Sequence, residues 1–292
     1  MKYRRNEPLS KHTSYKIGGP ADYLCQPKSL TELKSALQFA KNNKLPVAVI
    51  GSGTNLLAPD EGFRGLVIKF GQALNGISIK GSQVTVGSGV TIAQLLSILA
   101  HKRLGGLEFL ASIPGSIGGA VVMNAGAWGD EIGKHIIKIE AVTKEGKIRT
   151  ITQRQMHFKY RSSILQKQPW IVVSVTLKLS KKKKTVLQKM IKNYLALRRE
   201  KHPLGQPNCG SVFKNPARKL APLPAGKLIE SAGLKGLKVG QAQVSKKHAN
   251  FIVNLGGATA QDVTQLIQLV QKAVWKRFKI KLEPEVKTMV EF

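Results

Sequence analysis

Apolar residues recur along this chain with two periods that alternate from segment to segment. Residues 29–44, 91–103, 183–199 and 259–278 place apolar side chains three or four positions apart, which predicts four amphipathic helices. The last of these opens with Thr259 and Asp262 in the arrangement of a capping box. A shorter helix is expected over residues 226–232, ending at Gly233.

Short apolar or alternating runs predict β-strands between these helices. Single strands are expected at residues 47–50, 66–68, 170–179, 239–244, 250–253 and 286–290. Two hairpins are expected, one over residues 76–89 around Gly81-Ser82 and one over residues 136–151 around Glu145-Gly146. Meandering strands with occasional helices are typical of the α+β class. Pro203 and Pro207 follow the third long helix, so a domain boundary is expected near residue 200.

The composition restricts the partners and the cellular location. The 292 residues carry 47 Lys and Arg against 16 Asp and Glu, a net charge of +31, so the partners are expected to be anionic. The lysines are spread along the chain, and no helix-turn-helix, zinc-finger or aromatic RNA-binding pattern occurs, yet a basic nucleic-acid-binding protein stays an alternative. No apolar run is long enough for membrane insertion, and no signal peptide precedes the first helix. Two distant cysteines without a CxxC pair predict a cytoplasmic protein without a metal site.

Two loops of small residues stand out as candidate phosphate sites. Residues 105–133 are rich in Gly, Ala and Ser and nearly free of charge, and residues 51–55 read Gly-Ser-Gly-Thr-Asn after a buried strand. Such loops expose backbone N–H groups that can hold a phosphate, although tight packing without a ligand explains each loop alone equally well. Together the two loops suit a pyrophosphate held between them. Neither has the GxGxxG or GxxxxGK[ST] spacing of common nucleotide-binding motifs.

Three polar residues are candidates for catalysis, and each can also be explained by a structural role without catalysis. Arg161 precedes a strand and could be a surface cation. Ser211 follows Gly210 and could be a turn serine, next to Cys209, for which no local histidine signature suggests a nucleophile. Glu285, in Glu-Pro-Glu, could be a charged edge before the last strand.

Seven motifs in order along the chain resemble those of the UDP-N-acetylenolpyruvoylglucosamine reductase family. They are Thr-Ser-Tyr-Lys-Ile-Gly-Gly-Pro-Ala-Asp at residues 13–22, Gly-Ser-Gly-Thr-Asn-Leu at 51–56, the glycine-rich run 106–129, Tyr-Arg-Ser at 160–162, Gly-Ser-Val-Phe-Lys-Asn-Pro at 210–216, Lys-His-Ala-Asn-Phe-Ile-Val-Asn at 247–254 and Glu-Pro-Glu-Val at 283–286. Each motif alone is weak, whereas seven in the same order are specific. The short gap between Arg161 and Trp170 resembles the shorter type of the family, which lacks a tyrosine-bearing loop.

The resemblance implies a fold and a division into domains. It implies a PCMH-type, vanillyl-alcohol-oxidase-like unit that binds FAD through two subdomains, followed by a C-terminal α+β domain for the substrate. The expected boundaries are residues 1–70 for the first subdomain, joined by the C-terminal strand 282–292, residues 71–200 for the second, and residues 201–281 for the substrate domain.

The resemblance also implies the roles of individual residues. The catalytic residues would be Arg161, Ser211 and Glu285, and the substrate contacts would be Tyr160, Lys201, Asn215 and His248. The FAD contacts would be Ile50, Gly51, Ser52, Gly53, Thr54, Asn55, Ser112, Pro114, Gly115, Ser116, Gly118, Gly119 and Lys287. The chain departs from the family pattern at Trp128, where tyrosine is common, at Lys287, where arginine is common, and at Cys209, where a small residue is common.

The activity implied is the NADPH-dependent, FAD-mediated reduction of an enolpyruvyl UDP-sugar to UDP-N-acetylmuramate for the cell wall. NADPH would act as co-substrate, Arg161 would stabilise negative charge on the substrate carboxylate, and Ser211 would protonate the neighbouring carbon. The expected partner is the UDP-sugar, without specific nucleic acid, and the expected state is a monomer. A different flavin oxidoreductase of the same fold is the other alternative.

Overall fold

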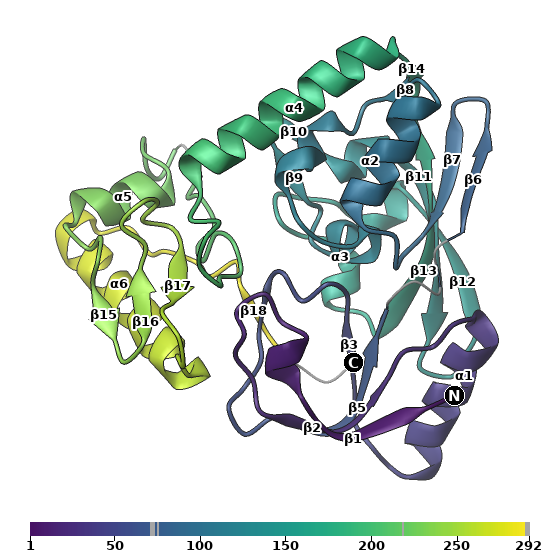
Figure 1. The fold of residues 1–292 in the computed structure, drawn as a ribbon, viewed down its shortest axis with the longest axis horizontal. Coiled ribbons are helices and arrows are strands. Elements are labelled where there is room, and N and C mark those ends of the chain that lie inside the picture. The colour runs from purple at the N-terminus through teal and green to yellow at the C-terminus, as the bar shows by residue number, and fades with distance from the viewer. Residues whose placement is uncertain (71–73, 75, 218, 290–292) are drawn as a thin grey trace.

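A computed structural model shows the chain as an α+β protein, as predicted, and describes residues 1–70, 74, 76–217 and 219–289. Figure 1 shows three parts: a small sheet near the N-terminus, a larger sheet covered by helices, and a C-terminal helix–sheet unit at the left. The five predicted helices are confirmed within two residues at each end, as α1 (Leu30–Asn42), α2 (Ile92–His101), α4 (Lys184–Lys201), α5 (Ala225–Ser231) and α6 (Ala260–Phe278).

The first sheet has the strand order β1-β2-β5-β3, formed by β1 (Tyr3–Pro8), β2 (Pro20–Cys25), β5 (Phe63–Lys69) and β3 (Val47–Ile50). Strands β2, β3 and β5 run parallel, and β1 is antiparallel to β2. Helix α1 covers one face through Leu33, Ala36, Leu37 and Ala40. Strands β1 and β2 were missed by the pattern analysis because β1 is an edge strand of mostly polar residues, which leaves no alternation to detect.

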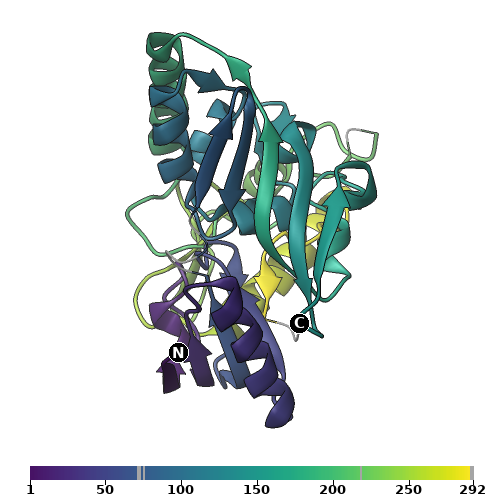
Figure 2. The same cartoon turned by 90° about the vertical axis from the view of Figure 1, so that its right-hand side faces the viewer.

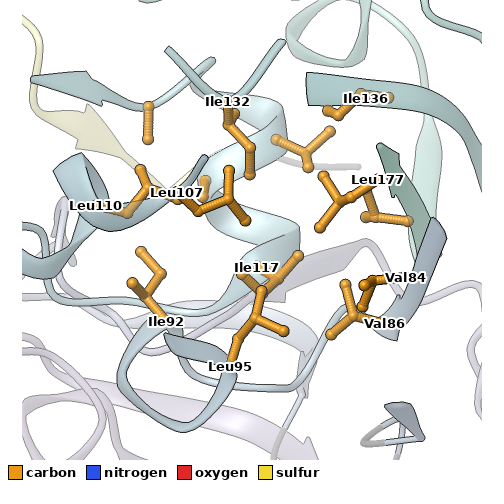
Figure 3. Packing of buried hydrophobic residues seen from close by; sticks show 14 of the residues in the cluster. Val84, Val86, Ile92, Leu95, Leu107, Leu110, Ile117, Ile132, Ile136 and Leu177 are labelled. Carbon is orange, nitrogen blue, oxygen red and sulfur yellow. The ribbon is translucent and has the colours of Figure 1, made fainter. Parts of the chain in front are cut away.

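The second sheet is antiparallel with the order β12-β11-β13-β7-β6. Both predicted hairpins are confirmed, as β6 (Ile77–Lys80) with β7 (Gln83–Gly87) and as β11 (Ile136–Thr143) with β12 (Ile148–Thr152), and β13 (Trp170–Lys178) lies between them. Figure 2 shows this sheet standing beside the helices that cover one of its faces. Figure 3 shows the core between them, where Val84, Val86 and Leu177 of the sheet face Leu95 and Ile117 of helices α2 and α3.

Helix α3 (Ile117–Val122) continues the second glycine-rich loop. The sequence indicated a buried apolar segment there without its helical form, because glycines at its start hide the helical period. Its packing role explains why so few polar residues follow the loop, since Ile117, Ala120 and Val121 are buried in the core of the second sheet.

Short elements complete the connections. They are the strands β4 (Leu56–Leu57), β8 (Leu104–Gly105), β9 (Gly126–Ala127), β10 (Asp130–Glu131) and β14 (Ser180–Lys181), and the 3₁₀ helices η1 (Leu9–Lys11), η3 (Glu108–Ser112), η4 (Ile132–His135), η5 (Arg154–Met156) and η6 (Ile164–Gln166). Strand β14 pairs with β8, and α4, which follows it, packs against η3 and α2. Helix α4 then runs from there to the C-terminal unit (Figure 1) and buries only Leu187 fully.

The C-terminal unit packs α5 and α6 against a small sheet of β15 (Lys238–Val239), β16 (Ala242–Val244) and β17 (Ile252–Asn254). The prediction of one strand over residues 239–244 is wrong, because a turn at Gly240-Gln241 divides it. Gly240 has a φ of 51°, and the Asp262 carboxylate fills the space beside it while accepting a hydrogen bond from Gln241 N–H. The capping box of α6 is confirmed, since Thr259 and Asp262 bond each other's backbone N–H groups.

The end of the chain returns to the first subdomain. Strand β18 (Lys287–Thr288) pairs in parallel with β4, directly after the loop of residues 51–55. The predicted last strand, residues 286–290, is therefore shorter, and its residue 290 lies outside the described residues. Some core clusters cross these parts, since Val142 and Ile171 of the second sheet pack with the core of the first sheet and Tyr15 with that of the C-terminal unit. The domain boundaries 1–70, 71–200 and 201–281 stay predictions.

Candidate active site

The two glycine-rich loops meet in space, although some sixty residues separate them. Thr54 Oγ1 donates to the Pro114 carbonyl at 3.0 Å. A Cβ added at Gly51 would lie 2.4 Å from Ser116 Oγ, and one added at Gly115 would lie 3.2 Å from Thr54 Oγ1. These positions need glycine because the loops approach each other more closely than larger residues would allow.

Free donors line this meeting point. The N–H groups of Ser52, Gly53, Thr54 and Gly115 donate to no acceptor within the described part of the chain. Consecutive free N–H groups in a small-residue loop form a concave anion site, and the donor set therefore fits a phosphate or pyrophosphate. Gly53 has a second role, because its φ is 67° and its backbone packs against His12, with Ser14 N–H donating to Gly53 O at 2.9 Å.

The remaining predicted cofactor residues support the loops. Ser116 caps helix α3 by accepting from Gly119 N–H, and Gly118 lies against Ser88, so these contacts are structural in the chain itself. Ile50 ends β3 and passes the chain into the first loop. Helix α3 has only six residues, so its N-terminus is too weak a dipole to indicate an anion site. The free N–H groups of the loops indicate one.

Arg161 is held by an unusual turn. Its φ is 52°, a left-handed conformation that arginine rarely adopts, in a turn closed by two 3.0 Å hydrogen bonds between the backbones of Lys159 and Ser162. Buried Asn124 fastens this turn, because its Nδ2 donates to Lys159 O at 2.9 Å and its Oδ1 accepts from Gly133 N–H at 3.0 Å. Backbone strain of this kind is typical of functional positions.

Arg161 faces Glu285, which the chain contributes from near its end. Arg161 Nε lies 2.6 Å from Glu285 Oε1, and both side chains are mostly buried. The contact is an ion pair whose angle does not make a hydrogen bond, so Nε remains without one among the described residues. Burial raises the pKa of Glu285 above its usual range, and the charge of Arg161 opposes that rise. A guanidinium with spare donors beside a carboxyl that protonates readily suits recognition of a second carboxylate.

Ser211 lies on the segment that also fixes Glu285. Glu285 N–H donates to Val212 O at 2.7 Å. The two candidate catalytic residues, Ser211 and Glu285, therefore lie on neighbouring loop segments that are hydrogen-bonded to each other. Ser211 Oγ forms no hydrogen bond to a described residue, which leaves it available to a ligand.

Asn250 clamps the segment that carries Ser211. Its carbonyl accepts from Val212 N–H at 2.8 Å, its Oδ1 accepts from Phe213 N–H at 2.9 Å, and its Nδ2 donates to Phe213 O at 2.8 Å. Asn250 is 4% exposed, so these bonds are shielded from water. The clamp fixes the backbone on the C-terminal side of Ser211 in one position.

Two of the predicted substrate residues touch each other across the same region. Tyr160 is half-exposed, and its hydroxyl accepts from Asn215 N–H at 3.3 Å. The Asn215 side chain accepts from Ala225 N–H at the start of α5. The Arg161 guanidinium lies 5.0 Å from the centre of the Tyr160 ring, so Tyr160 contacts both the candidate catalytic arginine and the C-terminal unit.

Lys201 and Trp128 form a second group beside the cofactor loop. Lys201 is the last residue of α4, and its Nζ lies 5.7 Å from the centre of the Trp128 ring. Trp128 donates from Nε1 to Ser112 Oγ at 3.1 Å and stacks on Tyr194 at 5.7 Å. The tryptophan that departs from the family pattern therefore links a predicted substrate residue to a predicted cofactor residue.

His248 belongs to an aromatic cluster with His202 and Phe251. The ring centres of His202 and His248 lie 5.6 Å apart. His248 Nδ1 accepts from Asn250 N–H at 3.2 Å, which leaves Nε2 as the protonated nitrogen. Burial lowers the pKa of both histidines, that of His202 to about 4, with nearby cations adding to the effect. His248 is thus neutral and tied to Ser211 through Asn250.

Lys287 and Cys209 complete the predicted positions. Lys287 N–H donates to Asn55 O at 3.1 Å, and Asn55 Nδ2 donates to Glu285 O at 3.2 Å, so the first loop is fastened to the segment carrying Glu285. Burial lowers the pKa of Lys287. Cys209 is buried beside Tyr15, and burial raises the pKa of its thiol to about 12, so it is no thiolate nucleophile at neutral pH.

Asn124 and Asn250 are the positioning residues that the sequence analysis did not single out. Both are amides inside apolar runs, between Met123 and Ala125 and between Ala249 and Phe251. A polar side chain in such a run must find buried partners, and this signal would have identified them as organisers of a site.

Comparison with known proteins identifies two matching domain families. Residues 21–152 match the family described as "FAD binding domain", and residues 202–289 match "UDP-N-acetylenolpyruvoylglucosamine reductase, C-terminal domain". A PCMH-type FAD-binding unit joined to that second domain defines the chain as a flavin-dependent oxidoreductase.

Relatives that match over nearly the whole chain identify the family within this class of oxidoreductases. The chain is 45% identical to the UDP-N-acetylenolpyruvoylglucosamine reductase of Bacillus licheniformis over 99% of its length and 95% of the relative's. It is 44% identical to that of Bacillus subtilis, covering 96% of this chain and 92% of the relative. The crystal structure of the reductase from Thermus caldophilus superimposes with a TM-score of 0.84 at 34% identity, covering 99% of both chains. This chain belongs to the UDP-N-acetylenolpyruvoylglucosamine reductase family.

Proposed function

We propose that this enzyme reduces UDP-N-acetylenolpyruvoylglucosamine to UDP-N-acetylmuramate in the cytoplasm, with NADPH as reductant, as a step of peptidoglycan synthesis. The family membership supports the substrate class. The observation that carries the proposal is the juxtaposition of Arg161, Glu285 and Ser211 beside two loops with free N–H groups.

FAD fits the chain at the meeting of the two loops. The N–H groups of Ser52, Gly53, Thr54 and Gly115 would hold its pyrophosphate, and the absence of side chains at Gly51 and Gly115 leaves room for the close approach. When bound, FAD supplies the hydride for the enolpyruvyl double bond and is replenished by NADPH. The chain's own residues bind, orient and protonate the substrate.

Arg161 would bind the enolpyruvyl carboxylate, on which negative charge builds during reduction. Its planar fork is fixed by the left-handed turn and by Glu285, so little reorganisation is needed as charge develops. Glu285 would orient Arg161 when ionised and would donate a hydrogen bond to the substrate when protonated. Its raised pKa makes the second form accessible at a higher pH than for a free carboxyl.

Ser211 would deliver the proton to the carbon that bears the carboxylate. Its Oγ has no hydrogen-bond partner among the described residues, and Asn250 fixes the backbone that follows it. A serine is a weak acid, so proton transfer requires the positive charge of Arg161 nearby as negative charge builds on the substrate.

The UDP-sugar would lie along the C-terminal unit. Lys201 would offer a cation for the diphosphate, and Tyr160, Asn215 and neutral His248 would contact the substrate as well. The strong positive charge of the chain would draw this ligand, with its diphosphate and its carboxylate, toward the enzyme.

The test is Ser211→Ala in stopped-flow kinetics. NADPH should reduce the bound flavin at the wild-type rate, whereas reoxidation by the enolpyruvyl sugar should slow by ~10²–10⁴, the usual contribution of a general acid. Reoxidation at the normal rate would remove Ser211 from the mechanism. Another flavin oxidoreductase of this fold would instead be reoxidised by a different sugar or alcohol and would tolerate the substitution.

A further inference from the structure

The C-terminal half of α6 exposes large apolar side chains among lysines. Trp275 is 51% exposed and Leu269 is 43% exposed, so both apolar side chains are open to contact from outside. Lys272, Lys276 and Lys279 are also exposed. We call these five residues the α6 patch.

The helical period places the α6 patch on one side of the helix. Val263, Val270 and Val274 are buried against the C-terminal unit. At about 100° per residue, Lys272 and Lys276 lie on the side of α6 away from Val270, between Trp275 and Leu269. The patch is therefore a strip along the exposed face of α6, with lysines at its centre and one apolar side chain at each edge.

The charge of this strip is unopposed. Residues 263–282 contain five Lys and Arg and no Asp or Glu. The additional cations, Arg277 and Lys281, are exposed as well, and none of the five pairs with a carboxylate among the described residues. Lys279 Nζ lies 6.0 Å from the centre of the Trp275 ring, so the cation and the aromatic ring are presented together.

The α6 patch lies away from the candidate active site. The start of α6 is fastened to Asp60 of the first subdomain by Ala260 N–H at 2.7 Å. Trp275 is fifteen residues further along the helix, ~22 Å from that contact at 1.5 Å per residue. Figure 1 shows α6 within the C-terminal unit, at the left of the molecule.

We propose that the α6 patch docks the enzyme on the surface of an anionic lipid bilayer. Lysines on a helix face attract acidic headgroups, and a half-exposed tryptophan inserts its ring at the level of those headgroups. Leu269 adds apolar area on the opposite edge of the strip. No helix within the described ranges is long and apolar enough to cross a membrane, so the helix would lie along the surface.

The experiment is co-sedimentation of the FAD-loaded enzyme with vesicles at 0.15 M salt. Binding is expected to vesicles of phosphatidylcholine with 30% phosphatidylglycerol and not to pure phosphatidylcholine. The triple variant Lys272→Gln, Lys276→Gln, Lys279→Gln should lower the partition coefficient by up to roughly 100-fold, from about fivefold per lysine. Trp275→Ser should also weaken binding, whereas reductase activity in solution should not change in either variant.

A matched control removes the same charge elsewhere. Lys41→Gln, Lys44→Gln, Lys80→Gln takes three exposed lysines from the FAD-binding part and should leave vesicle binding within about twofold of wild type. An equal loss in both triple variants would show diffuse attraction by net charge and would overturn the proposal. So would patch-dependent binding of a single-stranded oligonucleotide without vesicle binding, since Trp275 could stack on a base.

Discussion

His202 illustrates how burial controls charge at the scale of one residue. Its ring packs against His248 and Phe251, and His248 together with the cations Arg198, Lys247 and Lys201 disfavours a positive charge on it. Burial, helped by these cations, lowers its pKa from 6.5 to about 4. The neutral ring is therefore the form that the fold stabilises.

His202→Phe should make thermal stability less sensitive to acid. In the wild type the unfolded chain binds a proton at His202 below pH 6.5 and the folded chain does not, so stability is complete above pH 6.5 and falls between pH 6.5 and 4. Because the ring is partly exposed, the effect is on the order of 1 kcal/mol. Melting temperatures of both proteins from pH 7.5 to 4.5 test this, and parallel curves would contradict it.

The roles of individual site residues could be predicted from the sequence only in part. Arg161, Ser211 and Glu285 had simpler readings as a surface cation, a turn serine and a charged edge, and the resemblance to a family gave them roles. Sequence patterns report periodicity, whereas the Arg161–Glu285 contact joins segments more than a hundred residues apart. The left-handed turn at Arg161 has no sequence signature, because it depends on Asn124 bonding the Lys159 carbonyl.

At the scale of elements, Asn250 joins the turn before β17 to the segment that carries Ser211. Asn250→Ala would leave the N–H and C=O of Phe213 buried without partners, at about 1–3 kcal/mol for each group. The variant should keep normal flavin reduction by NADPH and slow the reoxidation by substrate, because Ser211 is no longer held. Stopped-flow traces and melting temperatures from one preparation measure both effects.

Asn43→Ala is the matched control for this change. It also removes an amide that donates to a backbone carbonyl, that of Phe39, but at the exposed end of α1. It should alter neither half-reaction. If Asn250→Ala lowers the melting temperature and leaves reoxidation unchanged, Asn250 is a stabilising residue without a positioning role.

Helices and hairpins were the elements that the sequence predicted best. Their apolar spacing is local, and Thr259 and Asp262 form the capping box that the sequence predicted. Strands β1 and β2 were missed because a polar edge strand is fixed by its neighbour. The turn inside residues 239–244 was missed because an Asp262 carboxylate from another element stabilises it.

At the scale of the whole molecule, Asp60 joins two parts of the chain. Its carboxylate accepts from Ala260 N–H at 2.7 Å and from Gln261 N–H at 3.0 Å, where the positive end of the α6 dipole adds to the attraction. The contact was not predictable, because Asp60 reads as an ordinary loop residue.

Asp60→Ala should lower the free energy of unfolding by about 1–3 kcal/mol, since two hydrogen bonds to a charged group are lost. The C-terminal unit should also become more susceptible to limited proteolysis. Asp22→Ala is the control, because it breaks the exposed ion pair with Arg64 within the first subdomain and should cost less than about 1 kcal/mol. Equal effects of the two variants in urea denaturation would show that Asp60 does not couple the parts.

The pairing of β18 with β4 has a consequence for synthesis of the protein. Domains generally fold in order as a chain leaves the ribosome. Here the loop of residues 51–55 receives its last backbone partner from Lys287, and Asn55 bonds Glu285. The nascent chain therefore cannot finish its first glycine-rich loop until residues 285–287 have left the ribosome. Chains that stop before residue 285 would keep this loop incomplete and would not sequester FAD there.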